Sequence, residues 1–327
     1  MGKENINFVH FYCVPFTGLG LFNGYRGDQW LRNRIKIFNE FVLPSIKAQG
    51  SRDIYLWFCW RLEEKTNPIV KDFITALEGT RDILAVHTFA GIPFYDDKYD
   101  DKTARERLMR TLELSLPELK GHVGDLPYVL MTIQPSDDMY LAGSNKLVQA
   151  KFRELIEQDS SLKKAVGFEK GYIMSYNTKE IAEYATTEWT TDKISTYHTD
   201  TIPPFFTILF SGEAFLDPQK HFDWIGPYKS HEYIGDHLEY TPLEKRSFVV
   251  GCHGENISTT YNHRYKGRIL PLEEAEEVMI RTGTLFTEPL MITPSTRLKV
   301  RSFVNKLPFR QQLKNIYYQL PIKLRKI

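Results

Sequence analysis

The sequence predicts an α/β fold, in which helices enclose a mainly parallel sheet. Segments with strand and helix character alternate at short intervals through the first 160 residues. Residues 53–60 (DIYLWFCW) form a continuous apolar run, as expected for a strand that is buried on both faces. Apolar residues also repeat at helical spacing at Leu31, Ile35, Phe38 and Val42. This alternation is typical of α/β sandwiches with right-handed crossover connections.

Each element of the first half has its own signal. The first helix has Asp28 as a suitable N-cap, and Gly50 ends it. Apolar runs bounded by turn residues predict the strands, and a 3.6-residue period predicts the helices. The predicted strands are 6–16, 53–60, 82–89 and a run that starts at residue 128, and the predicted helices are 30–49, 67–77, 102–116 and 144–158.

The second half is less regular. A Thr-rich segment, 186–201, is predicted to be a loop or hairpin over a cleft. The predicted strands are 171–176, 205–210 and 247–252, and the predicted helices are 231–240 and 272–282.

Composition indicates an ordinary globular protein. The chain has 327 residues, of which 42% are hydrophobic and 25% charged, which suffices for a sizeable core in one or two domains. Its three cysteines, Cys13, Cys59 and Cys252, are too widely spaced for a zinc or disulfide framework, so we expect buried reduced thiols. We expect no signal peptide and no membrane span. These features predict a soluble or peripheral cytoplasmic protein.

The charge is distributed unevenly along the chain. Residues 296–327 hold nine of the 42 Lys and Arg residues and no Asp or Glu, which leaves 33 basic and 41 acidic residues in 1–295. Apolar residues repeat at helical spacing in this tail, at Val300, Phe303, Val304 and Leu307. Basic amphipathic helices bind anionic membrane surfaces, so we predict contact with the cytoplasmic face of a membrane. The alternative is a helix packed on the domain with a solvated basic face.

Two adjacent carboxylates follow the strand that starts at Tyr128, in the turn Ser136-Asp137-Asp138. Ligands of open α/β sheets bind beyond the carboxyl ends of the strands. Carboxylates bind Mg²⁺ or Mn²⁺ and leave coordination positions open for substrate phosphates. The alternative is a polar turn that only ends the strand, because Asp is common in turns.

Several segments together resemble a rhamnosyltransferase family of bacterial glycosyltransferases, which is similar to nucleotide-sugar transferases of the GT-A type. They are WLRNRIKIFNEFVLPSIKAQ, IYLWFCW, the strand that ends SDDMY, and VVGCHGENIS, and the resemblance covers roughly residues 6–265. It implies a GT-A-like domain over 1–295, with a nucleotide-sugar-binding half (1–160) and an acceptor half (161–295).

The resemblance also implies roles for individual residues. Ser136-Asp137-Asp138 matches the DXD-like metal motif, with Asp138 as the direct ligand and Asp137 nearer the ribose or donor sugar. His253 matches a later third ligand of Mn²⁺ or Mg²⁺. The sequence departs from the family pattern at Trp60-Arg61, where relatives commonly have a nucleotide-binding Asp, and at Gln134-Pro135, where Arg-Leu is usual.

Further contacts with the donor follow from position in the sequence. Pro15 and Thr17 follow the first strand and are expected to contact the nucleotide base. Arg105 and Arg107 are expected to reach the diphosphate. The alternative for both arginines is a solvated helix face that pairs with Glu106 and Glu113.

The acceptor hydroxyl needs a base within hydrogen-bond reach. In inverting relatives this base is commonly the Asp of a Glu-Asp pair, and Gly235-Asp236 occupies that place here. We predict Asp236 as the base, with Glu232 as the second candidate. The alternative is that both are acidic residues stabilised at the start of a helix.

The resulting prediction is a metal-dependent, inverting glycosyltransferase. It would move a sugar, rhamnose by the family resemblance, from a nucleotide-diphosphate donor to a glycan or lipid-linked acceptor in cell-surface polysaccharide synthesis. A nucleotidyltransferase is the first alternative, for which Thr17-Gly18-Leu19-Gly20 is only a weak phosphate loop. A catalytically silent carbohydrate-binding protein is the second. Nucleic-acid binding is not expected, because residues 1–295 are acidic overall and carry no recognition motif.

Overall fold

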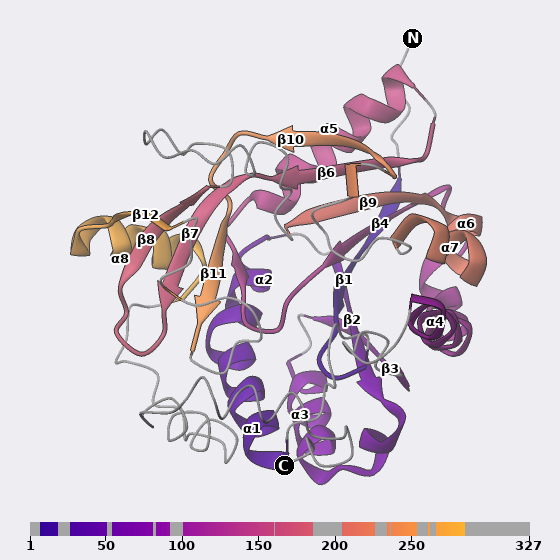
Figure 1. The fold of residues 1–327 in the computed structure, drawn as a ribbon, viewed down its shortest axis with the longest axis horizontal. Helices are drawn as coiled ribbons and strands as arrows, with labels where there is room; N and C mark the ends of the chain where they lie inside the picture. The colour runs from indigo at the N-terminus through magenta and orange to yellow at the C-terminus, as the bar shows by residue number, and fades with distance from the viewer. Residues whose placement is uncertain are drawn as a thin grey trace, which may run out of the picture.

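The computed structural model contains two sheets (Figure 1). The larger has seven strands in the order β10-β6-β9-β4-β1-β2-β3. Their bounds are β1 Phe8–Val14, β2 Ile54–Arg61, β3 Leu84–Gly91, β4 Tyr128–Ile133, β6 Lys164–Phe168, β9 Phe206–Ser211 and β10 Glu239–Leu243. The structure describes residues 7–18, 27–50, 54–80, 83–91, 101–159, 161–185, 205–225, 234–235, 237–253, 261 and 266–284.

The centre of the seven-stranded sheet is parallel, as predicted. β1 pairs in parallel with β2 and with β4, and β2 pairs in parallel with β3. β9 is antiparallel to both of its neighbours, β4 and β6. The chain runs outward from β1 through β2 to β3 and then returns to β4 on the other side of β1. The strand order therefore reverses between β1 and β4, and such a reversal point opens a ligand crevice in α/β sheets.

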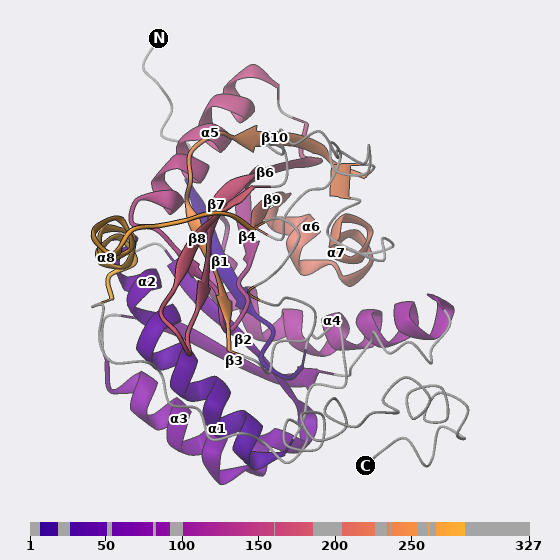
Figure 2. The same cartoon turned by 60° about the vertical axis from the view of Figure 1, so that its left-hand side comes forward.

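Helices cover both faces of this sheet (Figure 2). Alternate side chains of β1 point to opposite faces, with Tyr12 and Val14 in one core and Phe11 and Cys13 in the other. The first core is covered by α1 Asp28–Ile37, α2 Leu43–Lys47, α3 Pro68–Glu78 and α5 Ser144–Gln158, and the second by α4 Asp101–Val123, α6 Gly212–Leu216 and α7 Pro218–Ile225. The predicted α/β sandwich is confirmed at this level.

A second sheet of five strands, in the order β12-β8-β7-β11-β5, was not predicted. Its strands are β5 Met139–Tyr140, β7 Lys170–Ser175, β8 Ile181–Ala185, β11 Phe248–Cys252 and β12 Lys266–Ile269. α8, Leu272–Arg281, packs its buried face against this sheet. Each sheet contains strands from both sides of residue 160, so the predicted division into halves does not coincide with a division between sheets.

Three element predictions need correction. The first helix is three consecutive helical segments, because a π-helix at Phe38–Val42 separates α1 from α2. Asp28 is the first residue of α1, whose N-cap is Gly27. The predicted helix 231–240 is wrong at its end, because β10 begins at Glu239 and pairs with β6. The segment 186–201 and the tail 296–327 lie outside the described ranges.

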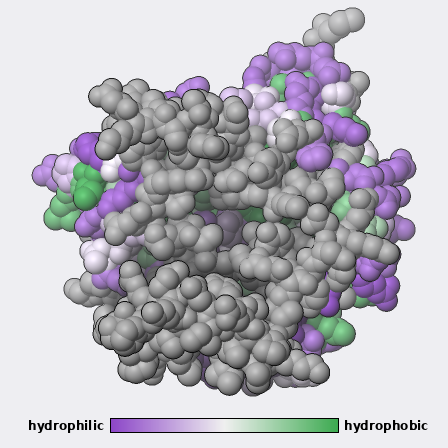
Figure 3. Space-filling model, in the orientation of Figure 1, coloured by the Kyte–Doolittle hydropathy of each residue, from purple (hydrophilic) through white to green (hydrophobic). Residues whose placement is uncertain are grey.

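The three cysteines are buried free thiols, as predicted. None of the helices in the described ranges is both long enough and apolar enough to cross a bilayer. The outer face of α8 mixes exposed apolar side chains, Leu272 and Ile280, with exposed glutamates (Figure 3).

Candidate functional site

The predicted acidic turn connects the two sheets. β4 belongs to the seven-stranded sheet, and the chain enters β5 of the second sheet after Asp138. Gln134 fixes this turn, because its side-chain Nε2 donates to the carbonyl oxygens of Pro135 and Asp138, each at 2.8 Å. Its backbone N–H donates to the carbonyl of Cys13 at the end of β1, also at 2.8 Å. The turn thus lies beside the point where the strand order reverses.

Pairing between β5 and β11 brings the end of β11 to the acidic turn. The two strands are antiparallel, with Met139 opposite Val249. The N–H of Gly251 donates to Oδ1 of Asp138 at 2.8 Å. A Cβ atom at Gly251 would lie 2.0 Å from the carbonyl oxygen of Asp137, so only glycine permits this approach. Tyr176 also binds the turn, since its hydroxyl donates to the carbonyl of Asp137 at 2.7 Å.

Two basic side chains contact one oxygen of Asp137. Nη1 of Arg34, from α1, lies 2.5 Å from Oδ2 of Asp137. Nε2 of His253, directly after β11, lies 3.2 Å from the same oxygen. The side chains are 5%, 2% and 14% exposed for Arg34, His253 and Asp137. The guanidinium also lies over the ring of Trp30, with Cζ 5.3 Å from the ring centroid. The site is therefore a largely buried cluster in which the charges of Arg34 and Asp137 pair beside the imidazole of His253.

The pKa values of the two carboxyl groups in the turn are shifted in opposite directions. Burial acts to raise the pKa of Asp137, but the charge of Arg34 and the hydrogen bond with His253 outweigh it and lower that pKa. Burial and the negative charge of Asp137 raise the pKa of Asp138 well above its usual range. Arg34 and His253 thus favour the ionised form of Asp137, whereas burial beside Asp137 disfavours the ionised form of Asp138.

Asp137 and His253 are residue types that bind divalent cations, and the distance between them suits such an ion. No group of three His, Cys, Asp or Glu side chains able to hold a metal occurs among the described residues. Asp137 Oδ2 and His253 Nε2, however, are 3.2 Å apart. Two neighbouring ligands of an octahedral ion with bonds of about 2.1 Å lie about 3 Å apart. Mg²⁺ commonly takes one or two carboxylates and completes its shell with water and phosphate oxygens, so a small protein ligand set suffices.

Asp138 does not join this pair. The resemblance implied that Asp138 is the direct ligand and that Asp137 lies nearer the sugar. In the structure the carboxylate of Asp137 contacts His253, and Oδ1 of Asp138 accepts from Gly251 instead. The antiparallel pairing of β5 and β11 gives the reason, because Asp138 immediately precedes β5 and its carboxyl binds the backbone of the partner strand.

The predicted base-binding residues Pro15 and Thr17 follow β1, near the reversal point. Pro15 is half-buried. Thr17 is buried and its hydroxyl bonds to the carboxylate of Glu64, which also accepts from the N–H of Arg61 at 3.2 Å. A Cβ atom at Gly18 would lie 2.5 Å from the carbonyl oxygen of Trp60, so close packing explains this glycine. Contact of Pro15 or Thr17 with a nucleotide stays a prediction.

The remaining predicted residues are not brought to the acidic turn by any described contact. Arg107 is half-buried on α4, which covers the opposite face of the sheet from α1. On the same helix, Arg110 pairs with Glu113 at 3.0 Å. The side chain of Arg105 and the whole of Glu232 and Asp236 lie outside what the structure describes.

Arg34 is the site residue that the sequence predictions missed. A signal was present, because Arg34 stands three residues after Leu31 and four before Phe38, on the apolar stripe of its helix. A charged residue on a buried stripe needs a partner of opposite charge. Asp137 is that partner, 103 positions further along the chain.

No family model matches the sequence, and no match was found among curated proteins. Among solved structures, the chain is similar to the crystal structure of S. aureus TarS, with 10% identity over 74% of this chain and 36% of that chain and a TM-score of 0.31. It is also similar to the bifunctional IspDF from Campylobacter jejuni, with 9% identity over 73% and 50% of the two chains and a TM-score of 0.24. Scores this low establish no shared fold, so the function proposed below rests on the site.

Proposed function

We propose that the protein is a metal-dependent glycosyltransferase that uses a nucleotide-diphosphate sugar. The observation that supports it most is the carboxylate of Asp137, which lies beyond the end of β4 beside the strand-order reversal and contacts both Arg34 and His253. Buried charge at this place in an α/β sheet indicates a ligand site rather than a purely structural turn.

Each residue of the cluster has a task in this proposal. Asp137 and His253 hold Mn²⁺ or Mg²⁺, which when bound acts as a Lewis acid on the departing diphosphate. Nε2 of His253 lies 3.2 Å from Oδ2 of Asp137, and a metal ion held by these two atoms would take the place of the proton that they share. Tyr176 binds the backbone carbonyl of Asp137, and the N–H of Gly251 binds the carboxyl of Asp138, so both contacts hold the turn from which the Asp137 carboxylate extends.

The catalytic base and the acceptor are proposed from the sequence alone. Asp236 takes the proton of the acceptor hydroxyl, with Glu232 as the second candidate, and the reaction inverts the anomeric centre. Asp236→Asn and Glu232→Gln are made separately, and full transfer activity in both folded variants would exclude both residues as the base.

The acceptor is a glycan or a lipid-linked glycan, reached at the cytoplasmic face of a membrane through the basic tail 296–327. We expect deletion of this tail to abolish binding to anionic phosphatidylserine vesicles. Unchanged vesicle binding would remove the membrane contact from the proposal and leave the proposed transferase chemistry untouched.

A thermal-shift panel of nucleotide sugars, with and without Mn²⁺, tests the function. We expect at least one nucleotide sugar to raise the melting temperature only when Mn²⁺ is present, because a ligand that binds the native form stabilises it. Asp137→Asn should abolish this shift and lower donor hydrolysis by about 100-fold or more, since the metal supplies several kcal/mol of charge stabilisation. The matched control is Asp72→Asn, an exposed residue of α3, which should behave as wild type.

The same panel separates the alternatives. Sugar binding without hydrolysis of any nucleotide sugar would indicate a carbohydrate-binding protein. Pyrophosphate release from a nucleoside triphosphate and a sugar phosphate would indicate a nucleotidyltransferase. If no nucleotide sugar shifts the melting temperature with Mn²⁺, the proposed function is wrong.

A further inference from the structure

We propose that Arg34 is an internal counter-ion of Asp137 that a divalent cation displaces, and that the released guanidinium then binds the diphosphate of the donor. This inference rests on the proposed function and assigns a role to a residue outside the motif that suggested it. Arg34 would thereby couple the arrival of the metal to the binding of the nucleotide.

The first step concerns the oxygen that the metal needs. A carboxylate oxygen has about two acceptor positions. Oδ2 of Asp137 already has two partners, Nη1 of Arg34 at 2.5 Å and Nε2 of His253 at 3.2 Å. A metal that replaces the histidine proton still meets a full positive charge next to the same oxygen. Because like charges repel strongly in a buried site, the metal and the guanidinium compete for Asp137.

The second step concerns the unused donors of Arg34. A guanidinium has five N–H donors in a planar fork. The Nε–H group of Arg34 is buried and has no hydrogen-bond acceptor within the part of the chain that the structure describes. A buried donor without a partner is uncommon and calls for a ligand atom or a water. The fork geometry of arginine matches the paired oxygens of a phosphate, which makes a diphosphate the fitting acceptor.

The third step concerns where the guanidinium goes. Its Cζ lies 5.3 Å from the ring centroid of Trp30, one helical turn earlier on α1. A tryptophan face attracts a guanidinium whichever anion the latter binds. Trp30 therefore supports Arg34 both while it pairs with Asp137 and after it turns toward a phosphate. The helix itself need not move, because a change of side-chain rotamer suffices.

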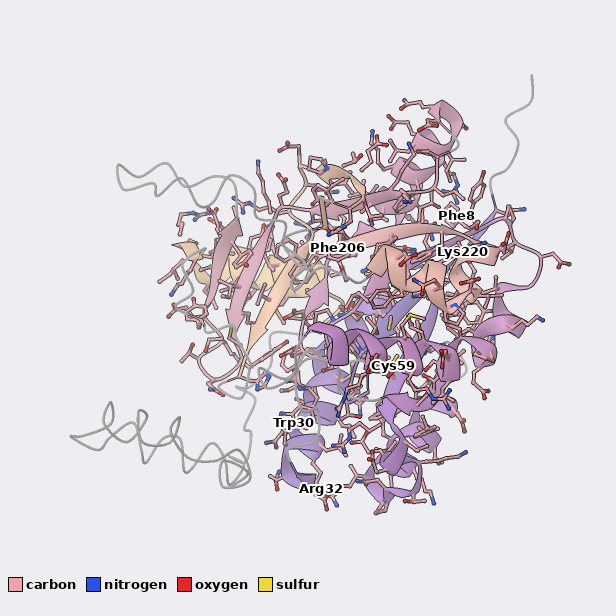
Figure 4. All side chains as sticks on the ribbon, turned by 45° about the vertical axis from the view of Figure 1, so that its right-hand side comes forward. Phe8, Trp30, Arg32, Cys59, Phe206 and Lys220 are labelled. Atoms are coloured by element: carbon pink, nitrogen blue, oxygen red, sulfur yellow. The ribbon has the colours of Figure 1, made fainter. Side chains whose placement is uncertain are left out.

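The test compares Arg34→Met with Arg32→Met. Arg32 lies on the same helix but is exposed, and Figure 4 shows it at the outer edge of the molecule. Mn²⁺ alone is titrated first by calorimetry. We expect Arg34→Met to bind Mn²⁺ about tenfold more tightly than wild type, because the competing charge is gone. The Mn²⁺-induced rise in melting temperature should be larger as well, since the metal supplies the missing partner of Asp137.

Inorganic pyrophosphate, titrated in the presence of Mg²⁺, tests the second half. We expect Arg34→Met to bind it at least tenfold more weakly, and Arg32→Met to match wild type in both titrations. Arg34→Lys keeps the charge but loses the fork, so its Mn²⁺ affinity should stay near wild type while its pyrophosphate affinity falls. A purely structural role for Arg34 predicts weaker Mn²⁺ binding, or no change, in Arg34→Met.

Each remaining outcome decides the matter. Equal or weaker Mn²⁺ binding by Arg34→Met refutes the competition, and unchanged pyrophosphate binding refutes the diphosphate contact. If Arg34→Met fails to fold, the double variant with Asp137→Asn removes both charges and should fold, and the Arg34→Lys titrations then decide. If wild type binds neither Mn²⁺ nor pyrophosphate, the proposed function itself fails. If wild type binds both and Arg34→Met behaves like Arg32→Met, only this inference fails.

Discussion

Strand β4 contributes to two buried polar regions that differ in charge. One residue before its end, Thr132 joins a neutral row across the sheet, with Nε2 of His10 on β1 at 2.7 Å and the hydroxyl of Thr207 on β9 at 2.5 Å. Beyond its end, Asp137 lies in the charged cluster with Arg34 and His253. Both regions are buried and polar. Burial of polar groups alone therefore does not identify a functional site, whereas buried ionised groups at a strand end indicate one.

The two regions stabilise their buried polar groups by different means. Burial lowers the pKa of His10 to about 3, so its ring is neutral near neutral pH, and its Nε2 pairs with the uncharged hydroxyl of Thr132. The ionised carboxylate of Asp137 needs opposite charge, which Arg34 supplies. A neutral row tolerates the loss of one member better than a charged cluster does, because a lone buried charge costs more than a lone hydroxyl.

The largest expected effect is on Asp137. Asp137→Ala leaves Arg34 buried without its partner and should lower the free energy of unfolding by about 3–5 kcal/mol. Thr132→Val removes one neutral hydroxyl between two partners and should cost about 1–3 kcal/mol. Urea unfolding of both variants measures the difference. Equal losses of unfolding free energy would show that the charged cluster tolerates the loss of one member as well as the neutral row does.

A second, smaller effect concerns pH. The pKa of His10 is about 3 in the folded protein against 6.5 for an unperturbed histidine. Between these values the unfolded chain binds a proton that the folded chain does not, so stability is present above pH 6.5 and declines as the pH falls. One such group contributes up to about 1.4 kcal/mol per pH unit. We expect His10→Asn to reduce the slope of unfolding free energy against pH between 6.5 and about 4.

Two other histidines, the half-buried His87 and the buried His221, have pKa values lowered to about 4 by desolvation and add slopes of the same sign. Replacing His10 should therefore reduce the pH dependence of the unfolding free energy but not abolish it. An unchanged slope in His10→Asn would mean that the neutral row does not restrict protonation of His10.

Local patterns in the sequence predicted most of the first half of the fold. The helix of residues 144–158 matches α5 at both ends, because its apolar period is regular and Gly143 precedes it. The second sheet was missed, since β5 is two residues long and β12 is four, which is too short for an alternating pattern. The approach of His253 to Asp137 spans 116 positions and follows from the β5–β11 pairing, which no local signal specifies. The family resemblance, not spacing, suggested that approach, and it offered no hint of Arg34.

The smallest expected effect uses a surface pair as the reference for Arg34. Lys151 and Glu154 on α5 form an ion pair at 2.8 Å, close to the 2.5 Å between Arg34 and Asp137, but the Glu154 side chain is half exposed. Water and salt screen such a pair, so Lys151→Ala should leave the melting temperature unchanged within error. In the absence of Mn²⁺, Arg34→Met should clearly lower the melting temperature. The two ion pairs have similar lengths, so the comparison tests the effect of burial. A clearly lower melting temperature in Lys151→Ala would show that ion-pair distance, not burial, sets the stability of the charged cluster.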